Sequence, residues 1–138
     1  MDSLDELKQQ NQDISELCAV LSILIEHPDL HNNPYVCELM QRFKEKVWLH
    51  LVFEDNTIYA ALLRHQHDTV SQTAKTFHES ARTIRHRFST YVKHWCQAAV
   101  SDAEHTALKN ESRDIFQLIM ERVQYENEVM FPLIEQHG

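Results

Sequence analysis

A histidine and a glutamate occupy inward positions of a long helical segment that is otherwise apolar. The apolar residues of this segment recur at steps of four, three and four residues, at Val36, Met40, Phe43 and Val47. This spacing is that of one face of an α-helix. The next inward positions are 50, 54, 57 and 61, and the first two carry His50 and Glu54. A polar pair therefore interrupts the apolar face.

A second segment repeats this pattern with an arginine in place of the histidine. Its inward positions are Leu108, Ser112, Ile115, Ile119, Arg122, Glu126, Val129 and Leu133. Residues 50–55 align with residues 122–127, which matches the glutamate, the aromatic residue before it and the Asp or Asn after it. Two buried carboxylates that face each other need a cation. The functional question is which cation this protein uses.

Four long helices must position these residues. We expect helices over about residues 3–26 and 34–64, a third capped by Asp68 or Thr69, and a fourth opened by a capping box at Ser101 and Glu104. The third helix should turn these residues inward: Val70, Ala74, Phe77, Ala81, Ile84, Phe88, Tyr91, Trp95 and Ala98. Pro132 should bend the last helix and free the carbonyl of Glu128. Short links predict a single all-α domain over residues 1–138, an up-down-up-down four-helix bundle.

The composition supports this fold and restricts the partners. One glycine and three prolines in 138 residues leave little material for hairpins or glycine-rich phosphate loops. A net charge of −8 disfavours nucleic acid and anionic membranes as partners. The start of the chain is acidic, unlike a signal peptide, and no apolar run approaches the roughly 20 residues that span a bilayer. Three cysteines without a CxxC spacing, Cys18, Cys37 and Cys96, suggest free thiols in a reducing, cytoplasmic compartment.

The motifs resemble those of the hemerythrin-like family, also called HHE cation-binding domains. The resemblance lies in the His-x-x-x-Glu spacing of His50 and Glu54, and in Glu126 followed by Phe131 and Pro132. It covers the whole chain in length and helix number, whereas the Glu-x-x-His spacing of ferritin-type sites does not occur. It implies a four-helix bundle. Members of the family typically hold two irons between the helices and bind or sense oxygen, nitric oxide or iron.

The resemblance is incomplete at the metal ligands. The family places a histidine on the first helix, where this chain has Asn11, and histidine on the third, where Phe77 and Ala81 stand. Arg122 stands where the fourth helix should carry another histidine. The metal ligands that the resemblance leaves are His50, Glu54 and Glu126, with His78, one residue off the inward face, as a fourth candidate.

Charge arithmetic separates two interpretations of this site. With a divalent metal, Glu54 and Glu126 contribute −2, the metal +2, and Arg122, which stays protonated, a further +1. Without a metal, Arg122 can pair with one carboxylate while His50 donates to the other, and a protonated His50 makes the group neutral. We favour the metal-free interpretation, with a buried polar network of Asn11, His50, Glu54, Arg122 and Glu126.

Two functional hypotheses follow from these interpretations. The first is a non-enzymatic binding or regulatory protein with no cofactor, which binds an unknown protein partner or small ligand and could form a homodimer. The second is a non-haem iron protein that binds or senses oxygen, nitric oxide or iron through a reduced His/Glu site. A di-iron oxidase or peroxidase ranks third, because few ligands remain. We expect the histidines of the links and outer faces to be solvated: His27, His31, His65, His67, His86 and His94.

Overall fold

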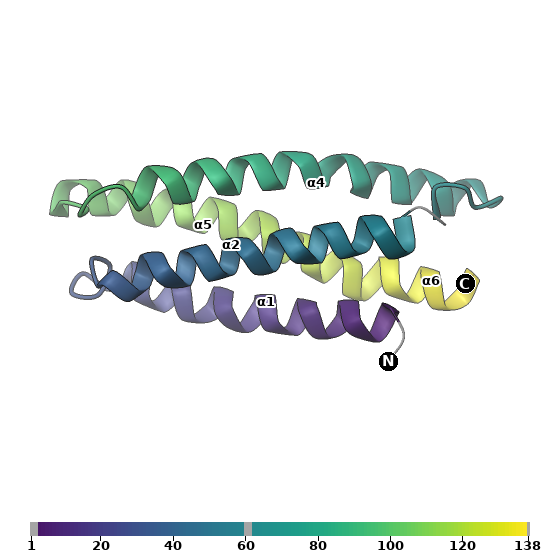
Figure 1. Cartoon of the computed structure of the whole chain (residues 1–138), viewed down its shortest axis with the longest axis horizontal. Helices are drawn as coiled ribbons and strands as arrows, with labels where there is room; N and C mark the ends of the chain where they lie inside the picture. Colours follow the sequence, from purple (N-terminus) through teal and green to yellow (C-terminus); the bar gives the residue numbers. More distant parts are fainter. Residues whose placement is uncertain (1–2, 60–61, 138) are drawn as a thin grey trace.

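The computed structural model describes residues 3–59 and 62–137, and the described part is all-α (Figure 1). Four long helices run through it: α1 (Ser3–Glu26), α2 (Pro34–Glu54), α4 (Asp68–Trp95) and α5 (Asp102–Tyr125). Two π-helical turns and a short final helix complete the elements, namely η1 (Asp55–Tyr59), η2 (Glu126–Met130) and α6 (Phe131–His137). The predicted all-α class is confirmed.

The helices form an up-down-up-down bundle. Helix α1 packs against α2 and α5, while α4 packs against α2 and α5, so that each long helix has two antiparallel neighbours. The start of α1 and the end of α6 lie at the same end of the bundle (Figure 1). None of the described helices combines the length and the apolar character that crossing a bilayer requires.

The helix starts follow local capping chemistry. Asn33 accepts a hydrogen bond from the backbone N–H of Tyr35 at 3.0 Å, and Pro34 occupies the first position of α2. The predicted capping box is present, with Ser101 and Glu104 bonded to each other's backbone N–H groups. The predicted side-chain cap of the third helix is wrong: its N-cap position is His67, which makes no side-chain capping bond.

Both π-helical turns shift the inward face by one residue. The sequence places Thr57 and position 61 inward, but the buried residues are Ile58 and Leu62, and position 61 lies outside the described residues. The same shift occurs after Glu126. A π-helical turn contains one residue more than an α-helical turn, so the apolar positions that follow it move forward by one.

The last helix shows this shift most clearly. Val129, which the sequence places inward, is 41% exposed, while Met130 and Phe131 are buried. Leu133, also placed inward, is half-buried. The N–H of Phe131 donates to the carbonyl of Glu126 five residues earlier, and Pro132 has no N–H to donate to Glu128. The irregularity therefore begins at Glu126, upstream of the proline.

A polar layer separates two apolar clusters along the bundle. The larger cluster fills the end where the 27–33 and 96–101 links lie, with Phe43, Phe88, Tyr91 and Phe116 among its residues. The smaller cluster fills the other end and consists of Leu7, Ile58, Tyr59, Leu62, Val70, Ala74, Met130 and Phe131. His50, Glu54, Arg122 and Glu126 are buried between these clusters. Because both carboxylates are removed from water, the layer must supply the positive charges and hydrogen bonds that keep them ionised.

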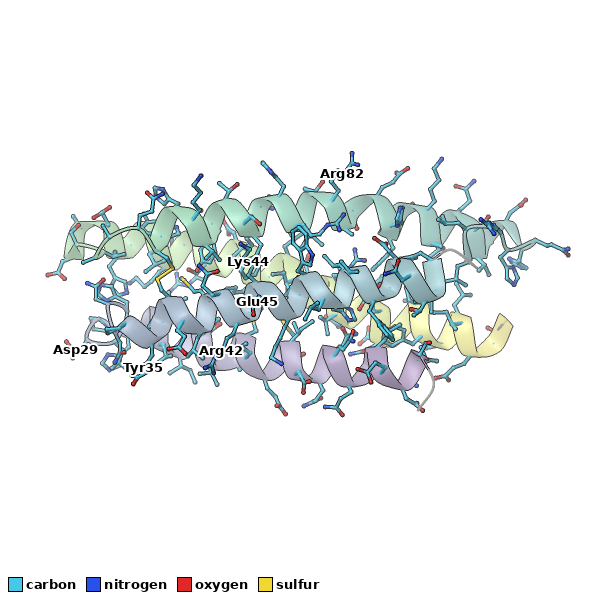
Figure 2. All side chains as sticks on the ribbon, viewed as in Figure 1. Asp29, Tyr35, Arg42, Lys44, Glu45 and Arg82 are labelled. Atoms are coloured by element: carbon cyan, nitrogen blue, oxygen red, sulfur yellow. A yellow bond between two sulfur atoms is a disulfide. The ribbon has the colours of Figure 1, made fainter. Side chains whose placement is uncertain are left out.

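The expectation of three free thiols is wrong. Cys37 in the first turns of α2 and Cys96 at the end of α4 form a disulfide, and the free cysteine in the described part of the chain is the buried Cys18. The bundle topology explains the pairing, because α2 begins at the end of the bundle where α4 finishes. Figure 2 shows the sulfur–sulfur bond at that end, near Asp29 and Tyr35. Cysteine spacing along the chain does not contain this information.

The burial of three further residues differs from what the sequence predicts. His31 is buried rather than solvated and stacks on His105, with ring centroids 3.8 Å apart. Ala98, which the sequence places inward, is exposed because α4 ends at Trp95. Phe77 is half-buried rather than part of the closed core.

Replacing the cap of α2 should lower the stability of the bundle. Asn33→Ala removes the acceptor of the Tyr35 N–H bond, and we expect a loss of about 1 kcal/mol in the free energy of unfolding. Asn110→Ala is the matched control, because Asn110 is exposed inside α5, where alanine is the better helix former. Urea unfolding measures both variants. An equal effect of the two substitutions would contradict the capping role.

Candidate functional site

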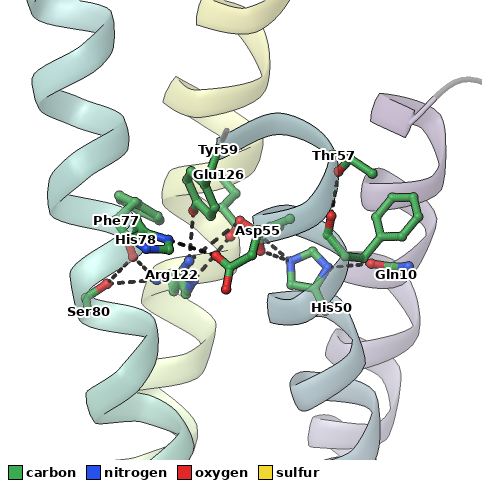
Figure 3. Close-up of polar contacts among 12 residues, drawn as sticks. Gln10, His50, Asp55, Thr57, Tyr59, Phe77, His78, Ser80, Arg122 and Glu126 are labelled. Carbon is green, nitrogen blue, oxygen red and sulfur yellow. Dashed lines mark hydrogen bonds and ion pairs between the residues drawn. The ribbon is translucent and has the colours of Figure 1, made fainter. Parts of the chain in front are cut away.

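His50 lies at the centre of the polar layer and faces three oxygen atoms. Its Nε2 is 2.7 Å from Oε1 of Glu54 and 2.9 Å from Oε1 of Glu126. Its Nδ1 is 2.8 Å from Oε1 of Gln10 on α1. With both glutamates ionised and the Gln10 amide oxygen facing the ring, these contacts place a proton on both ring nitrogens, because carboxylate and amide oxygens only accept hydrogen bonds. His50 is therefore an imidazolium ion held by α1, α2 and η2 (Figure 3).

Arg122 is the second cation of the layer. Its Nε donates to Oε2 of Glu126 at 3.2 Å, and one terminal nitrogen lies 3.6 Å from Oε2 of Glu54. The same terminal nitrogen donates to the hydroxyl of Tyr59 at 2.9 Å. The other donates to the hydroxyl of Ser80 at 2.8 Å and to the carbonyl of Phe77 at 3.0 Å. Every nitrogen of the guanidinium thus has an acceptor or an ion-pair partner.

The guanidinium also lies against an aromatic face. Its central carbon is 4.6 Å from the centroid of the Phe77 ring, which in turn stacks on Tyr125 at 4.6 Å. A planar guanidinium is suited to this contact, because it stacks on aromatic faces while donating in its own plane. The geometry excludes lysine as an equivalent residue at this position.

The four charged groups alternate in sign. His50 and Arg122 each lie four residues before a glutamate on their own helix, and each contacts the glutamate of the other helix as well. The two helix segments that align in sequence therefore face each other, with histidine on one side and arginine on the other. Two cations and two carboxylates sum to zero, so the buried layer carries no net charge.

The surroundings determine the protonation of each group. Burial lowers the pKa of His50, but the two carboxylates that it faces, Glu126 and Glu54, outweigh burial and raise the pKa to about 9. Burial raises the pKa of Glu54, but His50 and Arg122 outweigh it and hold that pKa at about 2. Burial, together with the negative charge of Glu54, raises the pKa of Glu126. Glu54 is thus the firmly ionised carboxylate of the pair.

Three of these residues form a set of donors for a metal ion. Atoms of His50, Glu54 and Glu126 lie within 4.8 Å of one another, and all three residues are buried. Both oxygens of Glu54 lack a hydrogen bond from the described residues, although His50 and Arg122 are close enough to form ion pairs with them. One imidazole and two carboxylates are too few for a pair of irons, so the residues present do not fit a di-iron centre.

The structure separates His78 from the other candidate ligands. Its Nδ1 lies 2.8 Å from Oδ1 of Asp55, and its side chain is 43% exposed. His78 therefore pairs with Asp55 at the edge of the polar layer and not with the three buried ligands (Figure 3). Asn11 is buried and donates to Asn127 across the bundle at 3.2 Å. Asn127 follows Glu126 in the sequence, and Asn11 itself makes no direct hydrogen bond to the charged groups in the described part of the chain.

Sequence reasoning missed three partners of the network: Gln10, Tyr59 and Ser80. Gln10 is next to Asn11 but off the regular inward positions, and Tyr59 enters the layer because η1 shifts the helical face. Ser80 is exposed and reaches Arg122 only through the length of the arginine side chain. By contrast, the sequence contained a signal for buried His105, which lies three residues before the inward Leu108.

The fold and the site define a class of protein: a four-helix bundle with carboxylates and a histidine converging between its helices. The family model described as the hemerythrin HHE cation-binding domain matches residues 2–134. The chain therefore belongs to this family. Neither a comparison with curated proteins nor one with solved structures finds a significant match.

Removing the guanidinium should destabilise the whole bundle. Arg122→Met keeps an apolar side chain of similar length but leaves two buried carboxylates with one cation, and we expect a loss of roughly 3–5 kcal/mol in the free energy of unfolding. Adding Glu126→Gln to Arg122→Met removes the excess negative charge and should restore part of that loss. Urea unfolding of the two variants measures the difference.

The matched control for this substitution is Arg113→Met. Arg113 is on the same helix and pairs with Glu26 on the surface, where water and salt screen the charges. We expect little change in stability. If Arg122→Met and Arg113→Met have the same effect, the buried network does not stabilise the fold.

Raising the pH should weaken the bundle through His50. The pKa of His50 is about 9 in the folded protein, compared with the ordinary value of 6.5 that applies to the unfolded chain. Protonation of His50 therefore stabilises the native state fully below about pH 6.5. This contribution is lost as the pH rises through about 9. We expect the free energy of unfolding to fall across this range in the wild type and to fall less in His50→Gln. The exposed His86→Gln is the control, and a wild-type stability independent of pH here would refute the imidazolium.

Proposed function

We propose that this protein is a non-enzymatic binding or regulatory module of the hemerythrin family, in which a charge network replaces the metal centre. The observation that carries the proposal is the position of Arg122, whose guanidinium pairs with Glu126 and lies 3.6 Å from Glu54. A permanent cation, together with protonated His50, therefore already neutralises the two carboxylates that would hold a metal. The module would act on a protein partner or a small ligand.

The charge balance supports the metal-free state. A divalent metal bound to neutral His50, Glu54 and Glu126 leaves the buried layer with the charge of Arg122 in excess. A guanidinium and a dication this close repel each other strongly in a medium of low dielectric constant. With His50 protonated instead, the layer is neutral and needs no further ion.

The absence of an enzymatic activity is part of the proposal. Metal-dependent oxidation needs enough ligands to hold the metal and open positions for the substrate. Here three donors converge, and two of them pair with Arg122. The network is suited to fixing the relative positions of the helices rather than to turning over a substrate.

Metal analysis of protein produced with added iron tests this proposal. We expect no stoichiometric iron and no visible absorption bands. About one or two equivalents of iron, with oxo-to-iron or azide-to-iron charge-transfer bands, would contradict the metal-free network.

A gain-of-function substitution makes the test sharper. Arg122→His removes the permanent charge and adds an imidazole at the position that corresponds to His50. We expect this variant to bind Fe²⁺ or Co²⁺ at least tenfold more tightly than the wild type, as measured by anaerobic titration. The matched control is Arg113→His, which adds an imidazole to the surface of the same helix and should not increase affinity. Equal affinities of the wild type and Arg122→His would count against the role of Arg122.

One observation favours a second candidate function, an iron protein that binds or senses oxygen, nitric oxide or iron. The buried carboxylate of Glu54 accepts no hydrogen bond from the described residues and lies beside His50 and Glu126, so a single ion would satisfy it. This alternative predicts that the wild type binds one equivalent of iron and that Glu54→Gln abolishes binding. Under the first proposal, Glu54→Gln changes stability alone.

A further inference from the structure

The disulfide opens into a cavity at the end of the bundle opposite the termini. Cys37 and Cys96 are each half-buried, and both line a cavity of about 260 Å³ between the start of α2 and the end of α4. Met40 and Trp95 form part of its apolar wall. A small molecule can therefore approach the sulfur atoms through a defined space, unlike at a disulfide sealed in a core.

A buried histidine lines the same cavity. His31 is 5% exposed, and neither of its ring nitrogens has a hydrogen-bond partner among the described residues. Its ring stacks on His105 at a centroid distance of 3.8 Å and an angle of 12° between the planes. His105 differs, because its Nε2 donates to the carbonyl of Ile25 at 2.7 Å. Unpaired buried polar atoms are uncommon and require an explanation.

The walls of the cavity have support that does not depend on the disulfide. The side chain of Asn32 pairs with the backbone of Val100, accepting from its N–H at 2.8 Å and donating to its carbonyl at 2.6 Å. These two bonds hold the 27–33 link against the 96–101 link. The end of the bundle should therefore stay closed when the sulfur–sulfur bond is broken, so that the bond can form again.

We propose that this cavity is a site of thiol–disulfide exchange, which accepts a low-molecular-weight thiol and uses His31 to handle the proton. The half-buried disulfide supplies the electrophile, and the cavity supplies the approach. His31 supplies two ring nitrogens that have no hydrogen-bond partner among the described residues, and a role in proton transfer explains why a histidine is buried there without a partner. This site is separate from the charge network and does not rest on the proposed function.

The exchange balances in two steps. The thiolate of the small thiol attacks one sulfur of the pair, forming a mixed disulfide and breaking the Cys37–Cys96 bond. His31 accepts the proton that the small thiol loses and passes it to the sulfur that leaves as a thiolate. A second molecule of the thiol attacks the mixed disulfide, releasing the oxidised small disulfide and the second cysteine. In total, two small thiols are oxidised and the protein disulfide gains two electrons and two protons.

Cys18 provides an internal control for this reactivity. It is 5% exposed on α1, and burial raises the pKa of its thiol, which leaves little of the reactive thiolate. The exchange chemistry should therefore be confined to Cys37 and Cys96. If Cys18 reacted as fast as the pair, the whole bundle would be unfolding, and the exchange would not be confined to one site.

The rate of reduction by glutathione in the folded full-length chain tests the site. We expect millimolar reduced glutathione to open the disulfide within minutes to hours while the circular dichroism of the helices is retained. Modification with a polymer-linked maleimide should then add two groups, at Cys37 and Cys96, with none at Cys18. A disulfide that is reduced only in urea would overturn the proposal and identify the bond as a sealed structural cross-link.

Substitution of His31 tests its part in the reaction. We expect His31→Gln to slow reduction by glutathione roughly tenfold and to remove an inflection from the pH dependence of the rate. His86→Gln, on the exposed face of α4, is the matched control and should leave the rate unchanged. An unchanged rate and pH profile in a folded His31→Gln protein would overturn the role of His31.

A second measurement applies if His31→Gln does not fold. Cys96→Ser leaves Cys37 in the cavity, and oxidised glutathione should form a mixed disulfide there that intact-mass spectrometry detects. The double variant Cys37→Ser, Cys96→Ser retains Cys18 and should form none. An adduct on Cys18, or no adduct on Cys37, would overturn the proposed site.

Discussion

The structure depends on the mutual neutralisation of four charges in a layer that water does not reach. Glu54 and Glu126 are fully buried, and neither could remain ionised there alone. His50 and Arg122 each contact both carboxylates, so that the layer is held from two helices at once. Shifting either helix by one residue would break the two contacts that join the helices, His50 to Glu126 and Arg122 to Glu54. The layer thus fixes the register of the bundle while contributing less than an apolar layer would to its stability.

The fold could be predicted from the sequence because periodicity is a local property. The long helices, the capping box and the buried positions of His50, Glu54, Arg122 and Glu126 all follow from steps of three and four residues. The rule failed after each glutamate, where a π-helical turn moved the inward face from Val129 to Met130. A π-helical turn has no simple sequence signal, so Tyr59 was not expected in the layer.

The contacts between distant segments could not be predicted in the same way. His78 was a candidate ligand because it lies near the inward face, but it pairs with Asp55 at the edge of the polar layer. The Cys37–Cys96 disulfide follows from the direction of the helices rather than from cysteine spacing. The charge network and the cavity beside the disulfide therefore lie apart along the bundle. One is a closed set of charges, and the other is a cavity open to small molecules.

The protonation of His50 tests the central claim most directly, because a metal and a proton compete for the same nitrogen. Nitrogen-15 NMR of the imidazole, on protein prepared from iron-supplemented cells, reports the protonation of each ring nitrogen. The charge network predicts that both nitrogens are protonated at neutral pH, as the pKa of about 9 requires. A ring with one unprotonated nitrogen bound to a metal, or a signal lost to a paramagnetic ion, would contradict the account.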